Sequence, residues 1–125
     1  INEGVASFVG SLGSNMGMNG CAGLYPGLVT VMLAQMVGIN IDISFLVMLA
    51  IVIAISSFGI AGLPGAATIA ISVVVSGMGL GSYFPLLGAI IAVDPILDMG
   101  RTFLNVSGTM VSAIAVGNSL KATKE

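Results

Sequence analysis

The sequence predicts an all-helical membrane protein, and three observations lead to that class. Of the 125 residues, 57% are hydrophobic and only 6% are charged, whereas a soluble domain carries roughly a quarter charged residues. Apolar runs of helical length alternate with clusters of glycine, asparagine and proline. One of these runs also carries a stripe of polar side chains, and ionisable groups inside a membrane usually line a substrate or ion path.

The composition excludes several functions. The net charge is −2, with no histidine, no tryptophan and only three basic residues, which argues against a nucleic-acid partner. Without histidine, the usual transition-metal sites and Ser–His–Asp catalysis lack their key residue. The single cysteine, Cys21, excludes an internal disulfide framework. Because Ile1 is not an initiator residue, we expect a C-terminal piece of a longer protein, which needs the remainder of its chain to function.

Residues 1–38 are predicted to form a broken helix. A helix end up to about Gly10 is followed by Ser11 to Gly23, a segment rich in glycine, asparagine and serine. Non-helical backbone at membrane depth survives only where protein or a water-filled cavity satisfies it, and such interruptions are binding sites in transporters. An apolar run from Leu24 to Gly38 then supplies the second half of the helix.

Residues 44–76 are predicted to form a re-entrant helical hairpin. Two short apolar runs flank residues 59–65, which contain three glycines and a proline, and each run is shorter than the roughly 20 residues of a membrane span. Ser44 is placed to cap the first arm. The alternative is a single kinked spanning helix, in which the Gly/Pro cluster is a plain tight turn.

Residues 83–117 are predicted to form the last transmembrane helix, which is long enough to require a tilt or a kink near Pro95. Its polar residues lie at offsets of 0, 4, 7, 8, 11 and 15, which share one helical face. Residues 118–125 are a polar tail, and Lys121 and Lys124 favour a cytoplasmic C-terminus. The stripe consists of Asp94, Asp98, Arg101, Thr102, Asn105 and Thr109.

Three segments resemble the dicarboxylate/amino acid:cation symporter family, which has the glutamate-transporter fold. Residues 94–108, DPILDMGRTFLNVSG, are similar to the last-helix motif D-x-x-L-D-M-G-R-T-x-x-N-V-[ST]-G. Residues 57–65, SFGIAGLPG, are similar to the tip of the second hairpin. Residues 19–26, NGCAGLYP, resemble the broken seventh helix, in the form found in the bacterial cystine symporter branch rather than the glutamate branch.

The resemblance implies the second half of an elevator-type transport domain, made of the broken seventh helix, the second hairpin and the last helix. It further implies a homotrimer of full-length chains in the cell (inner or plasma) membrane, each with several spans. The scaffold and the first hairpin would belong to the remainder of the transporter chain.

The resemblance also implies a substrate site. Asp98 matches the residue that binds the substrate's α-ammonium, and Arg101 matches the one that clamps a side-chain carboxylate. Structural alternatives stay open: an Asp98–Arg101 pair, hydrogen bonds between helices for Thr102 and Asn105, helix capping by Asp94, and simple packing for Cys21. The implied substrate-binding residues are Asp98, Arg101, Thr102, Asn105, Gly62, Leu63, Gly65 and Cys21.

A sodium site is implied in the same way, with departures from the family pattern. The glutamate branch carries an aspartate where this chain has Thr109, and a hydroxyl is a weaker, neutral ligand for a hard cation. Sodium is therefore the expected coupling ion, with protons as the alternative. At the hairpin tip, Ile60 and Ala67 replace a threonine and a glycine, which points to a different substrate. The implied sodium ligands are Gly13, Asn19, Asn105, Thr109 and Ser57.

From these features we expect cation-coupled symport of an amino acid, and no enzymatic activity or prosthetic group. L-cystine is the first expected substrate, followed by acidic amino acids and C4-dicarboxylates. The alternative from another class is an intramembrane assembly subunit, in which the polar stripe only holds helices together. A nucleotide-binding enzyme is a distant third, because the glycines from Gly77 to Gly81 lack the spacing and the lysine of a phosphate-binding loop.

Overall fold

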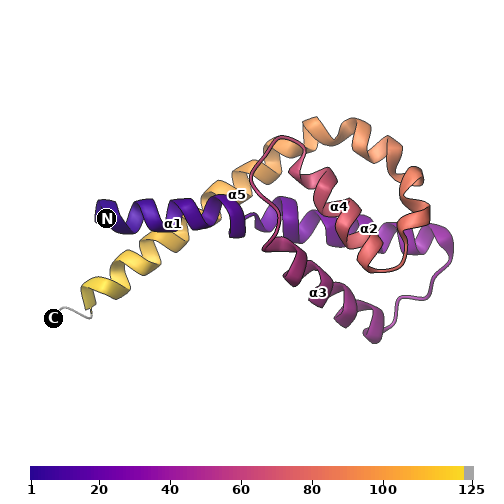
Figure 1. Ribbon diagram of the computed structural model, residues 1–125, viewed down its shortest axis with the longest axis horizontal. Helices are drawn as coiled ribbons and strands as arrows, with labels where there is room; N and C mark the ends of the chain where they lie inside the picture. The colour runs from indigo at the N-terminus through magenta and orange to yellow at the C-terminus, as the bar shows by residue number, and fades with distance from the viewer. Residues whose placement is uncertain (123–125) are drawn as a thin grey trace.

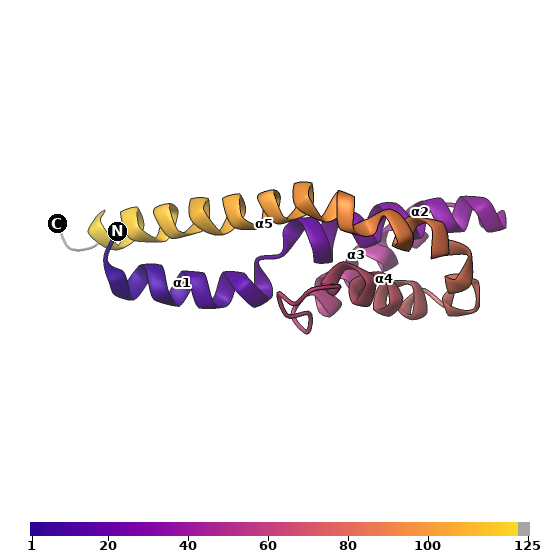
Figure 2. The same cartoon turned by 90° about the horizontal axis from the view of Figure 1, so that it is seen from above.

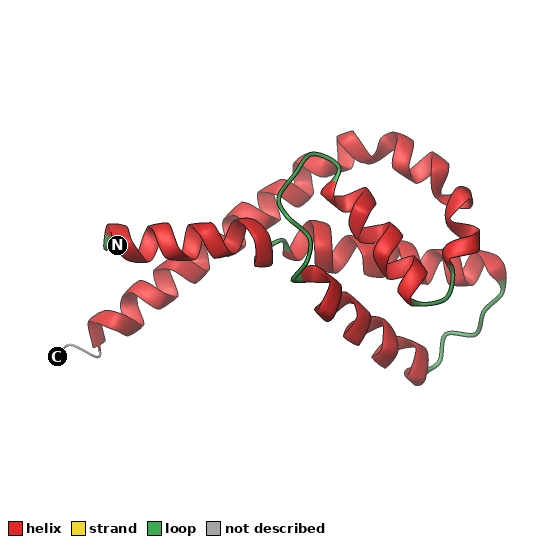
Figure 3. Cartoon of the chain, in the orientation of Figure 1, coloured by secondary structure: helices red, strands yellow, loops and turns green. Residues whose placement is uncertain are grey.

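The computed structural model describes residues 1–122, and every regular element in that range is a helix (Figures 1 and 3). This agrees with the helical class that the composition predicts. In chain order the elements are α1 (Glu3–Met16), the π-helix η1 (Asn19–Leu24), α2 (Tyr25–Val37), α3 (Ile43–Ser57), α4 (Ala66–Gly77), the 3₁₀-helix η2 (Gly81–Leu87) and α5 (Gly88–Ala122).

The first helix is interrupted, but over a shorter stretch than expected. α1 continues through the Gly/Ser/Asn-rich segment to Met16, where the backbone N–H of Gly17 donates to the carbonyl of Gly13 at 3.0 Å. Only Gly17 and Met18 separate α1 from η1. Helix propensity is a weak prior that packing overrides, and here Gly13 packs directly against Thr109 of α5.

Two antiparallel helices, α3 and α4, are joined by the loop 58–65. The expectation that Ser44 caps α3 was wrong: the carboxylate of Asp42 accepts a hydrogen bond from the N–H of Phe45 at 2.8 Å. Asp42 occupies the extended N-cap position, whereas Ser44 is already inside the helix. At the other end of the loop, Gly65 has φ of 82°, a left-handed conformation that favours glycine.

The last helix begins later and ends later than expected. Residues 81–87 form the 3₁₀-helix η2, which contains Pro85, and α5 then runs for 35 residues from Gly88 to Ala122. The expected tail from residue 118 is therefore helical as far as Ala122, and Lys124 lies outside the described residues. At roughly 50 Å, α5 is longer than a bilayer core. Pro95 lies within it, and the orange part of α5 curves in Figure 1.

The helices form an elongated arrangement with two parts (Figures 1 and 2). α1 lies along the C-terminal half of α5 at one end, and α2, α3 and α4 gather beside the first half of α5 at the other. The core lies between α2 and α4, where Leu33, Ala70 and Ile71 are fully buried. η1 sits at the junction and contacts α2, α3, α4 and α5, so the break in the first helix is at the centre of the structure.

Large apolar side chains cover much of the outer surface. Ile43, Ile96 and Met99 are 81%, 75% and 78% exposed, which water would disfavour strongly. Two helical stretches, Glu3–Val37 and Gly81–Lys121, are long and apolar enough to cross a membrane. The arms of the hairpin are shorter apolar helices.

Candidate functional site

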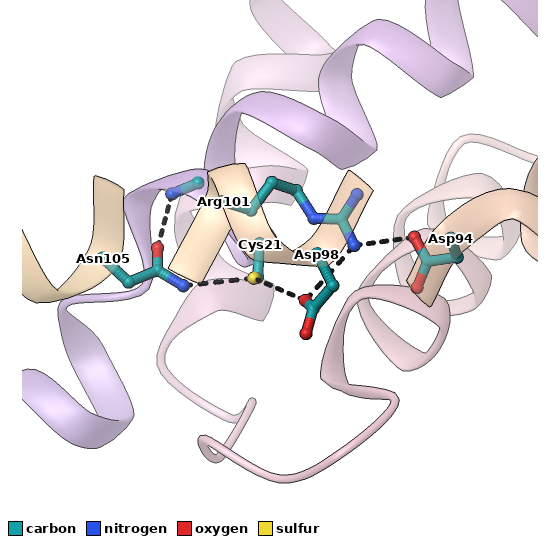
Figure 4. A network of polar contacts seen from close by, with 6 residues as sticks. Cys21, Asp94, Asp98, Arg101 and Asn105 are labelled. Atoms are coloured by element: carbon teal, nitrogen blue, oxygen red, sulfur yellow. Dashed lines mark hydrogen bonds and ion pairs between the residues drawn. The ribbon is translucent and has the colours of Figure 1, made fainter. Parts of the chain in front are cut away.

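Three charged residues of α5, Asp94, Asp98 and Arg101, form a compact ion-pair group (Figure 4). The Nη2 atom of Arg101 lies 2.7 Å from Oδ1 of Asp94 and 3.3 Å from Oδ1 of Asp98. Its guanidinium carbon also lies 3.9 Å from the centre of the Tyr25 ring in α2, a cation–π arrangement. Asp94 and Arg101 are buried, whereas the Asp98 side chain is 51% exposed. Asp94 is therefore an ion-pair partner here rather than a helix cap.

A second set of contacts joins α5 to η1. The backbone N–H of Gly20 donates to Oδ1 of Asn105 at 2.8 Å, and Nδ2 of Asn105 donates to Sγ of Cys21 at 3.1 Å. The thiol of Cys21 in turn reaches Oδ1 of Asp98 at 3.8 Å, so a continuous polar chain runs from Asn105 to Asp98 (Figure 4). π-helical turns often occur at functional sites, and this one holds Cys21 between two polar residues of the stripe.

Close backbone packing makes this arrangement possible. A Cβ atom on Gly20 would lie 2.8 Å from the carbonyl oxygen of Arg101 and 3.1 Å from Oδ1 of Asn105. Only glycine allows η1 to approach α5 so closely. The position of Cys21 beside Asp98 therefore depends on its neighbour in sequence.

A cavity of about 580 Å³ opens beside these residues, between α1, η1, the hairpin tip and α5. Its size is typical of small-molecule sites. Of the residues predicted for substrate or cation, four do not line it: Arg101, Gly65, Asn19 and Ser57. Those that do are Gly13, Cys21, Gly62, Leu63, Asp98, Thr102, Asn105 and Thr109.

The cavity also has lining residues that the sequence reasoning did not single out for the site. Val106 and Met110 continue the row of every fourth residue that starts at Asp98 and Thr102, so helical spacing could have identified them. They were missed because only polar positions were followed along the helix. The full set is Gly10, Ser14, Met18, Pro64, Ala66, Val106 and Met110.

The hairpin tip is docked onto the end of α1. The N–H of Gly62 donates to the carbonyl of Ser14 at 3.1 Å, and the last four carbonyls of a helix need such partners. A Cβ atom on Gly62 would lie only 2.7 Å from that carbonyl oxygen. The tip therefore closes one side of the cavity through a backbone contact that a side chain would obstruct.

The residues predicted to bind sodium are not brought together as one group. Gly13, Asn105 and Thr109 line the cavity together, and the Thr109 hydroxyl donates to the carbonyl of Asn105 at 3.1 Å. Asn19 instead lines a second cavity of about 430 Å³, which shares only Gly13 and Thr109 with the first. Ser57 donates to the carbonyl of Ala54 within α3, at 2.8 Å.

A broken helix, a docked hairpin tip and a polar helix face around one cavity are together typical of a secondary transporter. The chain belongs to the sodium:dicarboxylate symporter family, whose pattern it matches over residues 1–119. This is a family of membrane transporters and not of enzymes, so the expected class is confirmed.

Curated relatives give a more specific comparison. The chain is 50% identical over 117 residues to the L-cystine uptake protein TcyP of Shouchella clausii, covering 91% of this chain and 24% of the relative. It is 47% identical over 126 residues to the protein of the same name from Bacillus licheniformis, covering 100% and 26%. An uncharacterized symporter of Haemophilus influenzae is 49% identical over 112 residues, covering 89% and 25%. The chain thus spans about a quarter of the length of these relatives, and no solved structure matches it.

Proposed function

We propose that the full-length protein carrying this chain is a cation-coupled symporter that takes L-cystine into the cell. The main support is the cavity in which Asp98 and Asn105 of α5 face the hairpin tip. The names of the relatives from Shouchella clausii and Bacillus licheniformis point to cystine, and the family description points to sodium. Acidic amino acids and C4-dicarboxylates are the next candidates.

Asp98 is the proposed receptor for the α-ammonium group of the substrate. Among the described residues it is the only carboxylate that lines the cavity, and its side chain is half exposed. Asp94, Asp98 and Arg101 together carry one net negative charge, so a bound ammonium neutralises the group. A charge-assisted hydrogen bond in a low-dielectric cavity is stronger than one in water.

Arg101 is proposed to position Asp98 rather than to clamp a substrate carboxylate. Its Nη2 atom already contacts both aspartates, its ring contact is with Tyr25, and it does not line the cavity. Its Nε and Nη1 atoms are buried without hydrogen-bond partners among the described residues, so the ion pair with Asp94 and the Tyr25 ring are what hold the guanidinium. In this proposal Arg101 has the structural role that the sequence left open as the alternative for the Asp98–Arg101 pair.

Coupling is proposed to act through the hairpin tip. Gly62, Leu63 and Pro64 line the cavity while Gly62 is bonded to α1, so tip closure requires an ordered α1 end. A sodium ion bound near Gly13, Asn105 and Thr109 would find only neutral oxygen ligands on these three residues. Such binding would order the same region and favour the closed tip, which is the differential affinity that coupling requires.

The wider assembly follows the family expectation and is part of the proposal. This chain is proposed to form the C-terminal half of a mobile transport domain, with residues 1–38 as the broken helix and 44–76 as the hairpin. The full-length protein would be a multi-pass homotrimer of the cell membrane. The exposed apolar faces of α3 and α5 would contact lipid or the remainder of the chain.

The test is uptake of labelled L-cystine by the purified full-length protein in liposomes. An inward sodium gradient should drive accumulation, a matched choline gradient should not, and excess unlabelled succinate should leave it unchanged. If a proton gradient drives accumulation in the absence of sodium, the coupling ion is the proton rather than sodium. Uptake of aspartate or succinate but not of cystine would overturn the cystine assignment.

A further inference from the structure

The cavity wall contains an unusual share of sulfur. Three of its fifteen lining residues are Met18, Cys21 and Met110, although the whole chain has only eight methionines and one cysteine. The three come from the break after α1, from η1 and from α5, so sulfur atoms approach the cavity from separate elements. None of the lining residues is aromatic.

The sulfur atom of Cys21 lies close to Asp98, the proposed ammonium receptor. Its Sγ atom lies 3.8 Å from Oδ1 of Asp98, and the residue is 95% buried. In cystine, each sulfur is separated by one methylene from the carbon that bears the ammonium group. An ammonium bound at Asp98 therefore leaves the nearer sulfur of the substrate within reach of the Cys21 thiol.

The same position is unfavourable for an acidic amino acid. The side-chain carboxylate carbon of aspartate is separated from the α-carbon by one methylene, as is the sulfur of cystine. A buried carboxylate there would need a cation or several donors, and the described lining residues offer only neutral donors such as Thr102 and Asn105, with no lysine or arginine. Arg101 is paired with Asp94 and does not line the cavity. Thioether and thiol groups are instead soft, polarizable partners, which suit a neutral disulfide.

We infer that Met18, Cys21 and Met110 form a sulfur-lined subsite that recognises the disulfide of the substrate and excludes side-chain carboxylates. This inference rests on the proposed function and adds to it the residues that determine specificity. Met18 also supports the closed tip, because its Sδ atom lies 3.7 Å from the position of a Cβ atom on Gly62. Disulfide recognition and tip closure thus share one side chain.

The test compares cystine with 2,7-diaminosuberate, in which two methylenes replace the two sulfurs. Both compete against labelled L-cystine for uptake by the full-length protein in liposomes, and the ratio of their apparent affinities is measured. This ratio does not depend on how much protein folds. The wild type should prefer cystine, because thiol and thioether groups are polarizable partners for the disulfide sulfurs but not for methylenes.

Met110→Leu, Met18→Leu and Cys21→Ala should each move the ratio towards one. The two leucine substitutions keep side-chain volume nearly unchanged. Met99→Leu is the matched control, because Met99 is on the same helix as Met110 but is 78% exposed and outside the cavity lining; its ratio should stay at the wild-type value.

Three results would overturn the inference, and they separate its failure from failure of the proposed function. If the wild type takes up cystine but does not discriminate against diaminosuberate, or if all three variants keep the wild-type ratio, the sulfur subsite is wrong and the proposed function stands. If the wild type takes up no cystine, the proposed function and the subsite both fail.

Discussion

At the scale of single residues, the charged residues of the α5 stripe differ in burial and in their partners. Asp94 and Arg101 are buried and paired with each other, whereas Asp98 is half exposed at the cavity. The same helix face thus holds a buried ion pair and, at Asp98, the proposed ammonium receptor. The division follows from geometry, because the Tyr25 ring of α2 stacks on Arg101, whereas half of the Asp98 side chain is exposed.

Replacing Asp94 with asparagine should destabilise the protein. Arg101 would lose its nearest charged partner while remaining buried. Removal of one member of a buried pair costs about 3 kcal/mol or more. We expect a lower unfolding temperature for the full-length protein in detergent. Asp42→Asn is the control, because asparagine also serves as an N-cap and Asp42 lies on the surface. An unchanged unfolding temperature for Asp94→Asn would contradict a structural role for the pair.

Gly20 and Gly23 provide a matched pair within η1. Alanine at Gly20 would place a Cβ atom 2.8 Å from the carbonyl of Arg101, whereas Gly23 has no atom within 4 Å of that position. Gly20→Ala should therefore cost about 1–3 kcal/mol of stability through overpacking and weaken cystine binding by separating Cys21 from Asp98. Gly23→Ala should be close to neutral in both measurements. Equal effects of the two substitutions would show that the η1–α5 contact does not matter.

Much of the site could be predicted at the residue scale, and the misses have physical reasons. The periodicity of the polar stripe predicted that Asp98, Thr102, Asn105 and Thr109 share a face, and all four line the cavity. The roles assigned to them remain predictions. The burial of Arg101 could not be foreseen, because it depends on a ring in another helix. Met110 was missed because an apolar residue on a polar face carries no signal unless helical spacing is followed strictly.

At the scale of elements, the hairpin tip and the end of α1 form one unit. The backbone N–H of Gly62 donates a hydrogen bond to the carbonyl of Ser14, and both residues line the cavity. The sequence predicted a break in both regions but not that the two breaks meet. Long-range pairing of two loops depends on the packing of the helices that carry them. The extent of the first break was overestimated because local propensity was given more weight than contact with α5.

Gly62→Ala should weaken cystine binding. Its Cβ atom would lie 2.7 Å from the carbonyl of Ser14, so the tip would have to move and lose one hydrogen bond, an effect of roughly three- to tenfold in affinity. In the control Gly59→Ala, the added atom meets the Ser56 carbonyl at an ordinary 3.7 Å. Affinities are compared in the full-length protein at fixed sodium concentration. A Gly62→Ala variant with wild-type affinity would mean that the docked tip is not the binding-competent state.

At the scale of the whole molecule, this chain combines a packed interior with an outer surface that is unsuited to water. Leu33, Ala70 and Ile71 are fully buried, whereas Ile43 and Met99 are largely exposed. The class of protein followed from composition alone, since few charges and long apolar runs leave a membrane as the favourable environment. The elevator motion and the trimer stay proposals.

The central claim is that Asp98 binds the ammonium group of cystine in the cavity between α5 and the hairpin tip. Its most direct test is calorimetric measurement of L-cystine binding to the purified full-length protein in sodium, for the wild type, Asp98→Asn and the surface control Asp42→Asn. The account predicts that Asp98→Asn weakens binding by roughly ten- to a hundredfold, the range for hydrogen bonds to charged groups, and that Asp42→Asn binds like the wild type. Wild-type affinity in Asp98→Asn would contradict the account.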